Sequence, residues 1–233
     1  MNCPNLSERL LKAAELVPPC NTFLDVGTDH AYLPVYLIKK RICKKAIASD
    51  LRKGPLESAR RTAESFGVLP YTDLRLGSGF ETVAPGETDA AVVAGMGGIL
   101  ISELISASLN TVRQIKTLIL QPMTAVYELR KFLYENNFSI KDEFLVKEDS
   151  KLYHIMSVES GTPPKQTEAE LFMGKKLLSS ENPHLAEYIM RQLVKIKKQI
   201  DGLEKSKNPD SFKILNEKKK LLVEIKELLE RKD

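Results

Sequence analysis

Apolar and polar positions follow two different patterns along the chain. In the first two thirds, short apolar runs alternate with stretches of helical periodicity. Five runs have the length and composition of strands covered on both faces, at residues 22–26, 45–49, 72–76, 89–94 and 116–121. Helices are expected to begin near residues 31, 55, 98 and 124, and an amphipathic helix precedes them with apolar positions Leu6, Leu10, Leu11, Ala14 and Val17. The alternation predicts a parallel α/β sheet.

Two further apolar runs, at residues 138–146 and 152–158, are predicted to be adjacent antiparallel strands. They bring the expected sheet to seven strands. A Gly-Thr-Pro-Pro stretch at residues 161–164 then ends the alternation. We therefore expect one domain over residues 1–162 and a second over residues 163–233.

The second domain is predicted to be an α-helical hairpin of coiled-coil character. Apolar residues recur at steps of three and four, or their sum, on either side of a turn-like segment at residues 206–210. They are Ile189, Leu193, Ile196, Ile200 and Leu203 before the segment, and Leu215, Leu222, Ile225 and Leu229 after it. Such a seam holds two helices of one chain together or joins two chains. We expect the first arrangement, in a monomer rather than a dimer.

The composition is that of a globular protein, with 42% hydrophobic and 28% charged residues. No basic-then-apolar leader opens the chain, and no apolar run approaches the roughly 20 residues that span a bilayer. We expect a cytoplasmic protein without a membrane partner. Because Cys3, Cys20 and Cys43 lie in no CxxC or Cys/His cluster, neither a disulfide framework nor a bound metal is expected.

The net charge of +4 comes from the C-terminal part of the chain. Residues 1–164 hold 19 Lys and Arg against 19 Asp and Glu, and residues 165–233 hold 16 against 12. A weakly basic appendage is compatible with a nucleic-acid partner, because neutralisation of phosphates supplies much of the affinity for one. The same excess is also typical of an ordinary solvated helical face.

The carboxyl end of the first predicted strand carries the segment Asp-Val-Gly-Thr-Asp-His at residues 25–30. Gly27 lets the backbone approach a ligand, and the helix that follows offers unpaired N–H groups. The additional glycines with which dinucleotide enzymes cradle a pyrophosphate are missing. Asp25 and Asp29 would repel a pyrophosphate, but they suit the sulfonium and ammonium groups of S-adenosylmethionine (SAM). The segment therefore favours SAM over NAD.

Three later strand ends add candidate ligands. Asp50 lies 23 residues after position 27, close to the spacing at which nucleotide-binding folds place a ribose-hydroxyl acceptor. Residues 77–79 (Gly-Ser-Gly) would allow close approach to an adenine edge, where the Ser78 hydroxyl can bond the amine. The fourth strand runs into the glycine-rich residues 94–98, and glycines at the carboxyl edge of the sheet favour the close approach of a ligand.

Four segments together resemble the bacterial tRNA (adenine-22-N1)-methyltransferase family. They are residues 25–34 (Asp-Val-Gly-Thr-Asp-His-Ala-Tyr-Leu-Pro), Asp50 with residues 54–56 (Gly-Pro-Leu), residues 94–98 (Ala-Gly-Met-Gly-Gly) and residues 120–122 (Leu-Gln-Pro). The resemblance covers the first domain and reaches the hairpin only through its general helical character. It implies a Rossmann-like class I methyltransferase fold, SAM as the methyl donor, and N1 of adenine 22 in the D-loop of tRNA as the acceptor.

The strand ends and the resemblance together nominate the site residues. The expected SAM-binding residues are Asp25, Gly27, Thr28, Asp29, His30, Asp50, Leu51, Gly77, Ser78, Gly79, Ala94, Gly95 and Met96. The expected substrate-binding residues are Tyr32, Gly97, Gly98, Gln121 and Pro122. Tyr32 could stack on an adenine that has rotated out of the tRNA.

The chemistry expected of these residues centres on positioning. N1 of adenine has an in-plane lone pair that can attack a methyl group in line, so no strong base is required. The methylated ring is cationic until N6 loses a proton, and a carboxylate beside the ring would stabilise that charge. Asp29 is the candidate for this catalytic role. Alternatively, Asp29 only binds the amino acid portion of the donor or caps the next helix.

Two other functions remain open from the sequence alone. One is a SAM-dependent methyltransferase that acts on another RNA position, a small molecule or a protein. The other is a SAM- or RNA-binding regulator without turnover, because no residue is an unmistakable base. The hairpin correspondingly either grips tRNA or mediates association.

Overall fold

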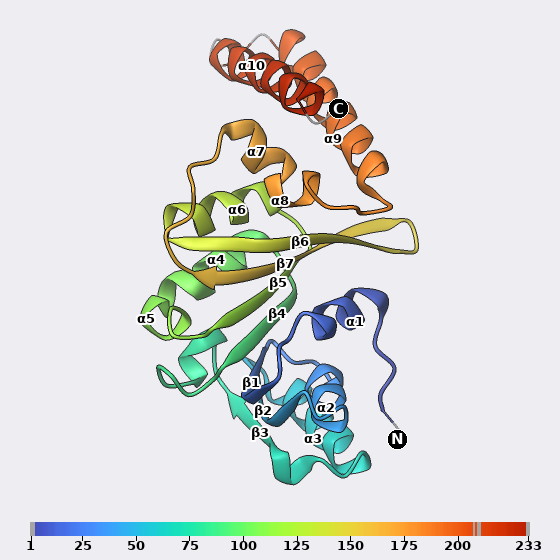
Figure 1. Ribbon diagram of the computed structural model, residues 1–233, viewed down its shortest axis with the longest axis vertical. Helices are drawn as coiled ribbons and strands as arrows, with labels where there is room; N and C mark the ends of the chain where they lie inside the picture. Colours follow the sequence, from blue (N-terminus) through green and yellow to red (C-terminus); the bar gives the residue numbers. More distant parts are fainter. Residues whose placement is uncertain (1–2, 207, 209–210, 232–233) are drawn as a thin grey trace. The chain divides into compact units, whose positions relative to one another are not determined.

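The computed structural model describes residues 3–206, 208 and 211–231 (Figure 1). The chain divides into two compact units, Met1–Pro163 and Pro164–Asp233. Of the turn predicted at residues 206–210, residues 207, 209 and 210 lie outside the described residues.

The first unit is built on a seven-stranded sheet. Its strands are β1 (Cys20–Val26), β2 (Cys43–Asp50), β3 (Thr72–Leu76), β4 (Ala90–Met96), β5 (Thr117–Pro122), β6 (Phe138–Glu148) and β7 (Lys151–Ser160). The order across the sheet is β3-β2-β1-β4-β5-β7-β6. Neighbours among β1 to β5 pair in parallel, whereas β7 is antiparallel to both β5 and β6. The predicted Rossmann-like sheet of seven strands is thereby confirmed.

Helices precede and connect these strands. They are α1 (Glu8–Glu15), α2 (Tyr32–Lys39), α3 (Lys53–Ser65), α4 (Gly98–Ala107), α5 (Leu109–Val112) and α6 (Val126–Glu135), with 3-10 turns η1 (Leu69–Tyr71) and η2 (Gly79–Thr82). Figure 1 shows α2 and α3 beside β1 to β3, α4 beside β4 and β5, and α6 beside β6.

Successive residues of a strand point to opposite faces of the sheet, and helices cover both faces. Leu24 and Val93 pack with α4, α5 and α6 in one buried cluster, whereas Phe23 and Val92 pack with α1 and α2 in another. A third cluster joins α2 and α3 over Ala48. β1, β4 and β5 are mostly buried on both faces, which explains their continuous apolar runs. The expectation was wrong for β3, which lies at the edge of the sheet, is mostly exposed or half-buried and carries two charged residues.

A buried ionic cluster, which the sequence did not reveal, fastens α6 to β6 and β7. Arg130 donates to both carboxylate oxygens of Glu143, at 3.2 Å and 2.6 Å, and His154 Nδ1 lies 2.9 Å from Glu143 Oε1. Burial alone would raise the pKa of Glu143, but the charge of Arg130 and the interactions with His154 outweigh it and lower that pKa to about 2. Glu143 is therefore ionised, and the cluster is a structural element of the first unit.

In its described residues, the second unit comprises α7 (Glu168–Met173), α8 (Lys175–Leu178), α9 (Leu185–Glu204) and α10 (Ser211–Glu230). Helices α9 and α10 pack along each other, and every residue of the predicted apolar seam is buried or half-buried. Lys219 and Glu204 add an ion pair of 2.6 Å between these helices. The predicted pair of packed C-terminal helices is confirmed. No helix in the described residues combines the length and apolar character needed to cross a membrane.

Candidate cofactor and substrate site

A cavity of about 370 Å³ opens where β1 and β4 end. It is lined by Arg9, Leu10, Asp25, Gly27, Thr28, Asp29, His30, Ala31, Tyr32, Leu33, Ala94 and Gly95. Ligands of open parallel sheets bind at the carboxyl edge, and cavities of this size hold small molecules. Eight predicted site residues are thus brought together: Asp25, Gly27, Thr28, Asp29, His30, Tyr32, Ala94 and Gly95.

Gly27 makes the turn that ends β1. Its φ is +77°, and the N–H groups of Gly27 and Thr28 both donate to the carbonyl of Ser49 at 2.8 Å. A Cβ at position 27 would be strained at this φ and would collide with the end of the Met96 side chain. The glycine therefore keeps the first and fourth strand ends close, as a ligand bound between them would require.

Asp25 supplies a buried carboxylate to the cavity lining. Burial raises its pKa to about 6, although a hydrogen bond from the Thr28 side chain opposes the shift, and the charge of Asp50 raises it further. Among the residues that the structure describes, Asp25 forms no ion pair. A desolvated carboxylate without an internal cation is suited to the cationic end of a ligand.

Asp29, His30 and Tyr32 form the exposed rim of the cavity. The carboxylate of Asp29 lies 3.4 Å from His30 Nε2, and the His30 ring stacks on the Tyr32 ring with centroids 5.3 Å apart. The side chain of Asp29 is 79% exposed, in contrast to Asp25. The rim thus offers a charged group and an aromatic surface that an approaching substrate can reach.

Arg9 of α1 also lines the cavity, and the sequence had assigned it no role. Its Nη1 donates to Gln121 Oε1 at 2.7 Å, and the same oxygen accepts the N–H of Gly95 at 3.1 Å. The Gln121 side chain is fully buried, and its Nε2 donates to the carbonyl of Pro122 at 3.2 Å. Gln121 therefore supports the wall of the cavity, while its substrate-binding role stays a prediction. The place of Arg9 in the cavity lining is visible only in the structure, where Arg9 meets Gln121, a residue 112 positions away in the sequence.

The loop after β4 is fixed to the loop after β5. Met123 N donates to the carbonyl of Met96 at 2.8 Å, and Gly98 N donates to that of Thr124 at 2.9 Å. Gly98 is buried, and a Cβ there would collide with the carbonyl oxygen of Ala125. The absence of a side chain at Gly98 is therefore explained by packing between the loops. Gly97, Gly98, Gln121 and Pro122 all lie outside the cavity lining.

The remaining residues that were predicted to bind SAM lie further along the same sheet edge, outside the cavity lining. Asp50 ends β2, and its carbonyl accepts the N–H of Gly77 at 3.0 Å, which fastens the end of β3 to it. Leu51 is 71% exposed beside it. Ser78 and Gly79 complete this group at the start of η2, while Met96 contacts the Gly27 turn from β4. Asp50, Leu51 and residues 77–79 thus lie on the β2–β3 side of Asp25, and Met96 lies on the β4 side.

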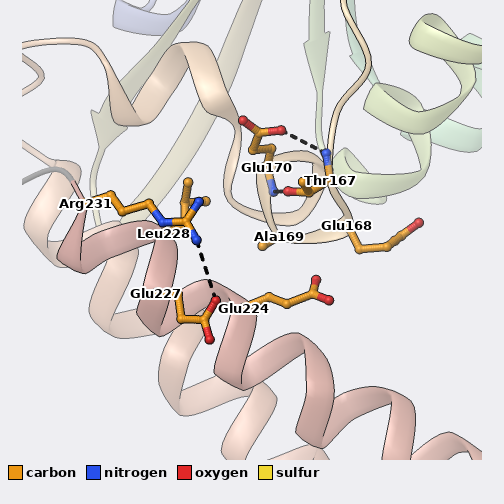
Figure 2. Close-up of a pocket in the computed structure, with 8 residues that line it drawn as sticks. All are labelled: Thr167, Glu168, Ala169, Glu170, Glu224, Glu227, Leu228 and Arg231. Carbon is orange, nitrogen blue, oxygen red and sulfur yellow. Dashed lines mark hydrogen bonds and ion pairs between the residues drawn. The ribbon is translucent and has the colours of Figure 1, made fainter.

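A second cavity, of about 410 Å³, lies within the C-terminal unit (Figure 2). Four glutamates and one arginine contribute to its lining, which comprises Thr167, Glu168, Ala169, Glu170, Glu224, Glu227, Leu228 and Arg231. Thr167 and Glu170 are engaged in a reciprocal cap of α7, and Figure 2 shows Arg231 directed at Glu227. An acidic surface of this kind disfavours phosphate groups.

The strand order and the position of the first cavity define the class of protein. A parallel sheet in the order β3-β2-β1-β4-β5, extended by β7 and β6, is typical of class I methyltransferases. Members of this class use SAM, and an acidic, glycine-turned pocket at the end of β1 fits its cationic groups better than a pyrophosphate.

Comparison with known proteins identifies the family. The sequence profile of the tRNA (adenine(22)-N(1))-methyltransferase family matches residues 23–230, and the chain belongs to this family. It is 37% identical over 161 residues to the tRNA (adenine(22)-N(1))-methyltransferase of Bacillus subtilis, covering 69% of this chain and 68% of that protein.

Two solved structures extend the similarity over nearly the whole chain. The crystal structure of the Bacillus subtilis tRNA methyltransferase TrmK matches with a TM-score of 0.88 and 29% identity, covering 97% of this chain and 99% of the other. A Streptococcus pneumoniae protein in complex with S-adenosyl-L-methionine matches with a TM-score of 0.81 and 29% identity, covering 95% and 99%.

Proposed function

We propose that the chain methylates N1 of adenine 22 in tRNA at the cavity beside Gly27 and Gly95. When bound, SAM supplies a methyl group on a sulfonium that a ring nitrogen can attack. The observation that carries the proposal is Asp25: a buried carboxylate with a pKa near 6, in the lining of a glycine-turned cavity, without an internal cation. Such a group is costly to bury unless a cation joins it.

The residues of the donor side follow from their positions along the sheet edge. Asp25 binds the ammonium group of SAM. Gly27 and Ala94 have no side chain or a small one, and they leave room for the rest of the amino acid portion of SAM. Asp50, only 12% exposed at the end of β2, accepts the ribose hydroxyls. The adenine then lies toward Leu51 and Ser78, where the large exposed fraction of Leu51 supports an apolar contact with a ring.

The acceptor side is the exposed rim. Tyr32 is 42% exposed and already stacked on His30, so its free face offers a platform for a base rotated out of the tRNA. Ile99 (57%) and Leu100 (46%) are exposed in the first turn of α4, and Met123 (42%) is exposed directly after β5, where its N–H is bonded to the end of β4. Apolar groups in such a position can pack against nucleotides that have lost their stacking partners.

The mechanism that these residues support is one of orientation and electrostatics. N1 presents its own lone pair, so the protein has to hold the ring in line with the methyl group rather than remove a proton first. Asp29 at the rim would stabilise the cationic ring and, with His30, provides polar atoms near the N6 proton that is lost later. We predict that Asp29→Asn lowers kcat by about 10- to 1000-fold, while Kd for SAM changes less.

The C-terminal hairpin is proposed to bind the tRNA backbone. Exposed lysines stand on both of its helices, including Lys195, Lys197 and Lys198 on α9. The acidic cavity of Figure 2 marks the α7–α10 surface as one that phosphates avoid. Deletion of residues 165–233 should leave SAM affinity nearly intact and weaken tRNA binding, whereas unchanged tRNA affinity would refute this role. The apolar seams of α9 and α10 cover each other within one chain, so we also propose a monomer. Light scattering would measure the molar mass that tests this.

The function is tested with two tRNA transcripts that differ only at position 22. The protein is incubated with methyl-labelled SAM and either the transcript with adenine 22 or one with guanine there. Incorporation into the first and not the second is expected. Equal incorporation into both would mean another RNA position, and labelling of neither would contradict the proposed activity.

A further inference from the structure

Arg9 is the basic residue of the cavity lining whose charge the proposed function leaves unused. The guanidinium lies over the glycine turn of β4, with Nη1 3.9 Å from the point that a Cβ on Gly95 would occupy. Gln121 holds it there through the 2.7 Å hydrogen bond to Nη1. The Arg9 side chain is 25% exposed, so it is partly withdrawn from solvent.

The other contacts of Arg9 leave much of its hydrogen-bonding capacity available. Its ion pair with Glu148 runs through Nε and is long, at 3.8 Å, and its guanidinium carbon lies 5.7 Å from the Tyr153 ring centroid. Among the described residues, Nη2 has no hydrogen-bond acceptor. A guanidinium fixed at one nitrogen and open at another is suited to a carboxylate.

The charges of the cavity lining can be compared with those of the donor. The lining carries two carboxylates, Asp25 and Asp29, and two basic side chains, Arg9 and His30. His30 is already paired with Asp29 at the rim. This leaves buried Asp25 as the single anion and Arg9 as the single strong cation for a bound ligand. The amino acid end of SAM carries one ammonium and one carboxylate, which matches this pair in number and sign.

We infer that Arg9 binds the carboxylate of the amino acid end of SAM, while Asp25 takes the ammonium. This inference rests on the proposed position of SAM in the cavity. It gives α1 a function: the helix that precedes the sheet supplies a ligand to the donor. It also explains the position of the buried Gln121, because its Oε1 holds in place both Arg9 and Gly95, two residues that line the SAM cavity.

The test compares two ligands that differ only in the carboxylate, using calorimetry with the full-length protein. One is S-adenosylhomocysteine, and the other is its decarboxylated form, a thioether amine. For Arg9→Met we expect the affinity for S-adenosylhomocysteine to fall about 10- to 100-fold, as for loss of a charge-assisted hydrogen bond. The affinity for the decarboxylated ligand should change less than about 3-fold. Arg9→Lys, which keeps the charge, should recover part of the difference.

The controls separate this inference from its alternatives. Lys12 lies on the same helix, outside the lining, and pairs with Glu15 at 3.1 Å, so Lys12→Met should bind both ligands normally. Equal losses for both ligands in Arg9→Met would show that Arg9 only shapes the loop, and unchanged affinities would show no role in donor binding. Loss of tRNA affinity alone would assign Arg9 to a phosphate. Each of these results overturns the inference, whereas a wild-type protein that binds neither ligand would refute the proposed cofactor site itself.

Discussion

Arg9 Nη1 lies 2.7 Å from Gln121 Oε1, across 112 residues of sequence. The same oxygen accepts the N–H of Gly95 at 3.1 Å. One buried amide thus joins the first helix to the glycine turn of β4, and the cavity wall depends on a residue that does not line it.

Gln121→Ala should weaken the binding of SAM and S-adenosylhomocysteine, although Gln121 itself is not proposed to contact them. Removing the amide leaves the Gly95 N–H and the Arg9 guanidinium without their shared acceptor, at a cost of about 1–3 kcal/mol. We expect the affinity for S-adenosylhomocysteine to fall about 10-fold in calorimetry. Gln114, which is exposed, provides the matched control Gln114→Ala. Equal affinities for the two variants would contradict the supporting role of Gln121.

Asp25→Asn should stabilise the free protein and abolish most of its SAM binding. The pKa of Asp25 is raised to about 6 in the folded state, above an unfolded value near 4. Between these pKa values the folded state binds more protons than the unfolded state. The free energy of unfolding therefore falls as the pH rises from about 4 through about 6. Above pH 6 the asparagine variant should be more stable by about 1–3 kcal/mol, as measured by denaturant unfolding.

The same carboxyl should make donor affinity depend on pH. A cationic ligand binds the ionised form, so the wild-type affinity for S-adenosylhomocysteine should fall as the pH drops through about 6, and binding near that pH should release a proton. Asp25→Asn should lose this pH dependence. A wild-type affinity that stays flat between pH 5 and 8 would exclude Asp25 as the ammonium ligand.

Glu143→Gln should destabilise the first unit without a change in its site. The substitution removes the carboxylate that Arg130 contacts with two nitrogens, and breaking a buried ion pair costs about 3–5 kcal/mol. Because its folded pKa is lowered to about 2, Glu143 contributes stability above its unfolded pKa, and this is lost as the pH falls from about 4 toward 2. The melting temperature should drop by roughly 10 °C relative to Glu135→Gln, at an exposed position. Equal melting temperatures would show that the cluster does not stabilise the fold.

Tyr32→Ala should affect the use of tRNA more than the binding of the donor. Loss of a stacking surface costs about 1–3 kcal/mol per base, so kcat/KM for tRNA should fall about 10- to 100-fold. Tyr32→Phe keeps the ring and should stay within about 3-fold of wild type. Tyr71, which is 55% exposed on η1, gives the control Tyr71→Ala. If Tyr32→Ala lowered only the affinity for S-adenosylhomocysteine, Tyr32 would belong to the donor side.

The local sequence pattern predicts the sheet well because its central strands are buried on both faces. Continuous apolar runs mark β1, β4 and β5, and the ends of the runs of β1 and β4 place Asp25, Gly27 and Gly95 at one edge, whereas the run of the edge strand β3 carries two charged residues. The structure brings these three residues to one cavity because the carboxyl ends of parallel strands meet at the same edge.

What the sequence could not predict depends on contacts between distant segments. The sequence pattern gives no sign of a role for Arg9, because its partner Gln121 is 112 residues away. The pairing of Glu143 with Arg130 and His154 was hidden for the same reason. Gly98 was predicted to bind substrate, which stays a prediction, but the structure adds a packing reason for the glycine, because a Cβ there would collide with the carbonyl oxygen of Ala125.

Methylation of adenine 22 at this cavity is tested by mapping the methylated atom. Unmodified tRNA is incubated with SAM and the protein and then reverse-transcribed, because a methyl group on N1 blocks the Watson–Crick edge and stops the polymerase. We predict a SAM-dependent stop at adenine 22 with the wild-type protein and its loss with Asp25→Asn. A stop at another position, or an undiminished stop with Asp25→Asn, would contradict methylation of adenine 22 at this cavity.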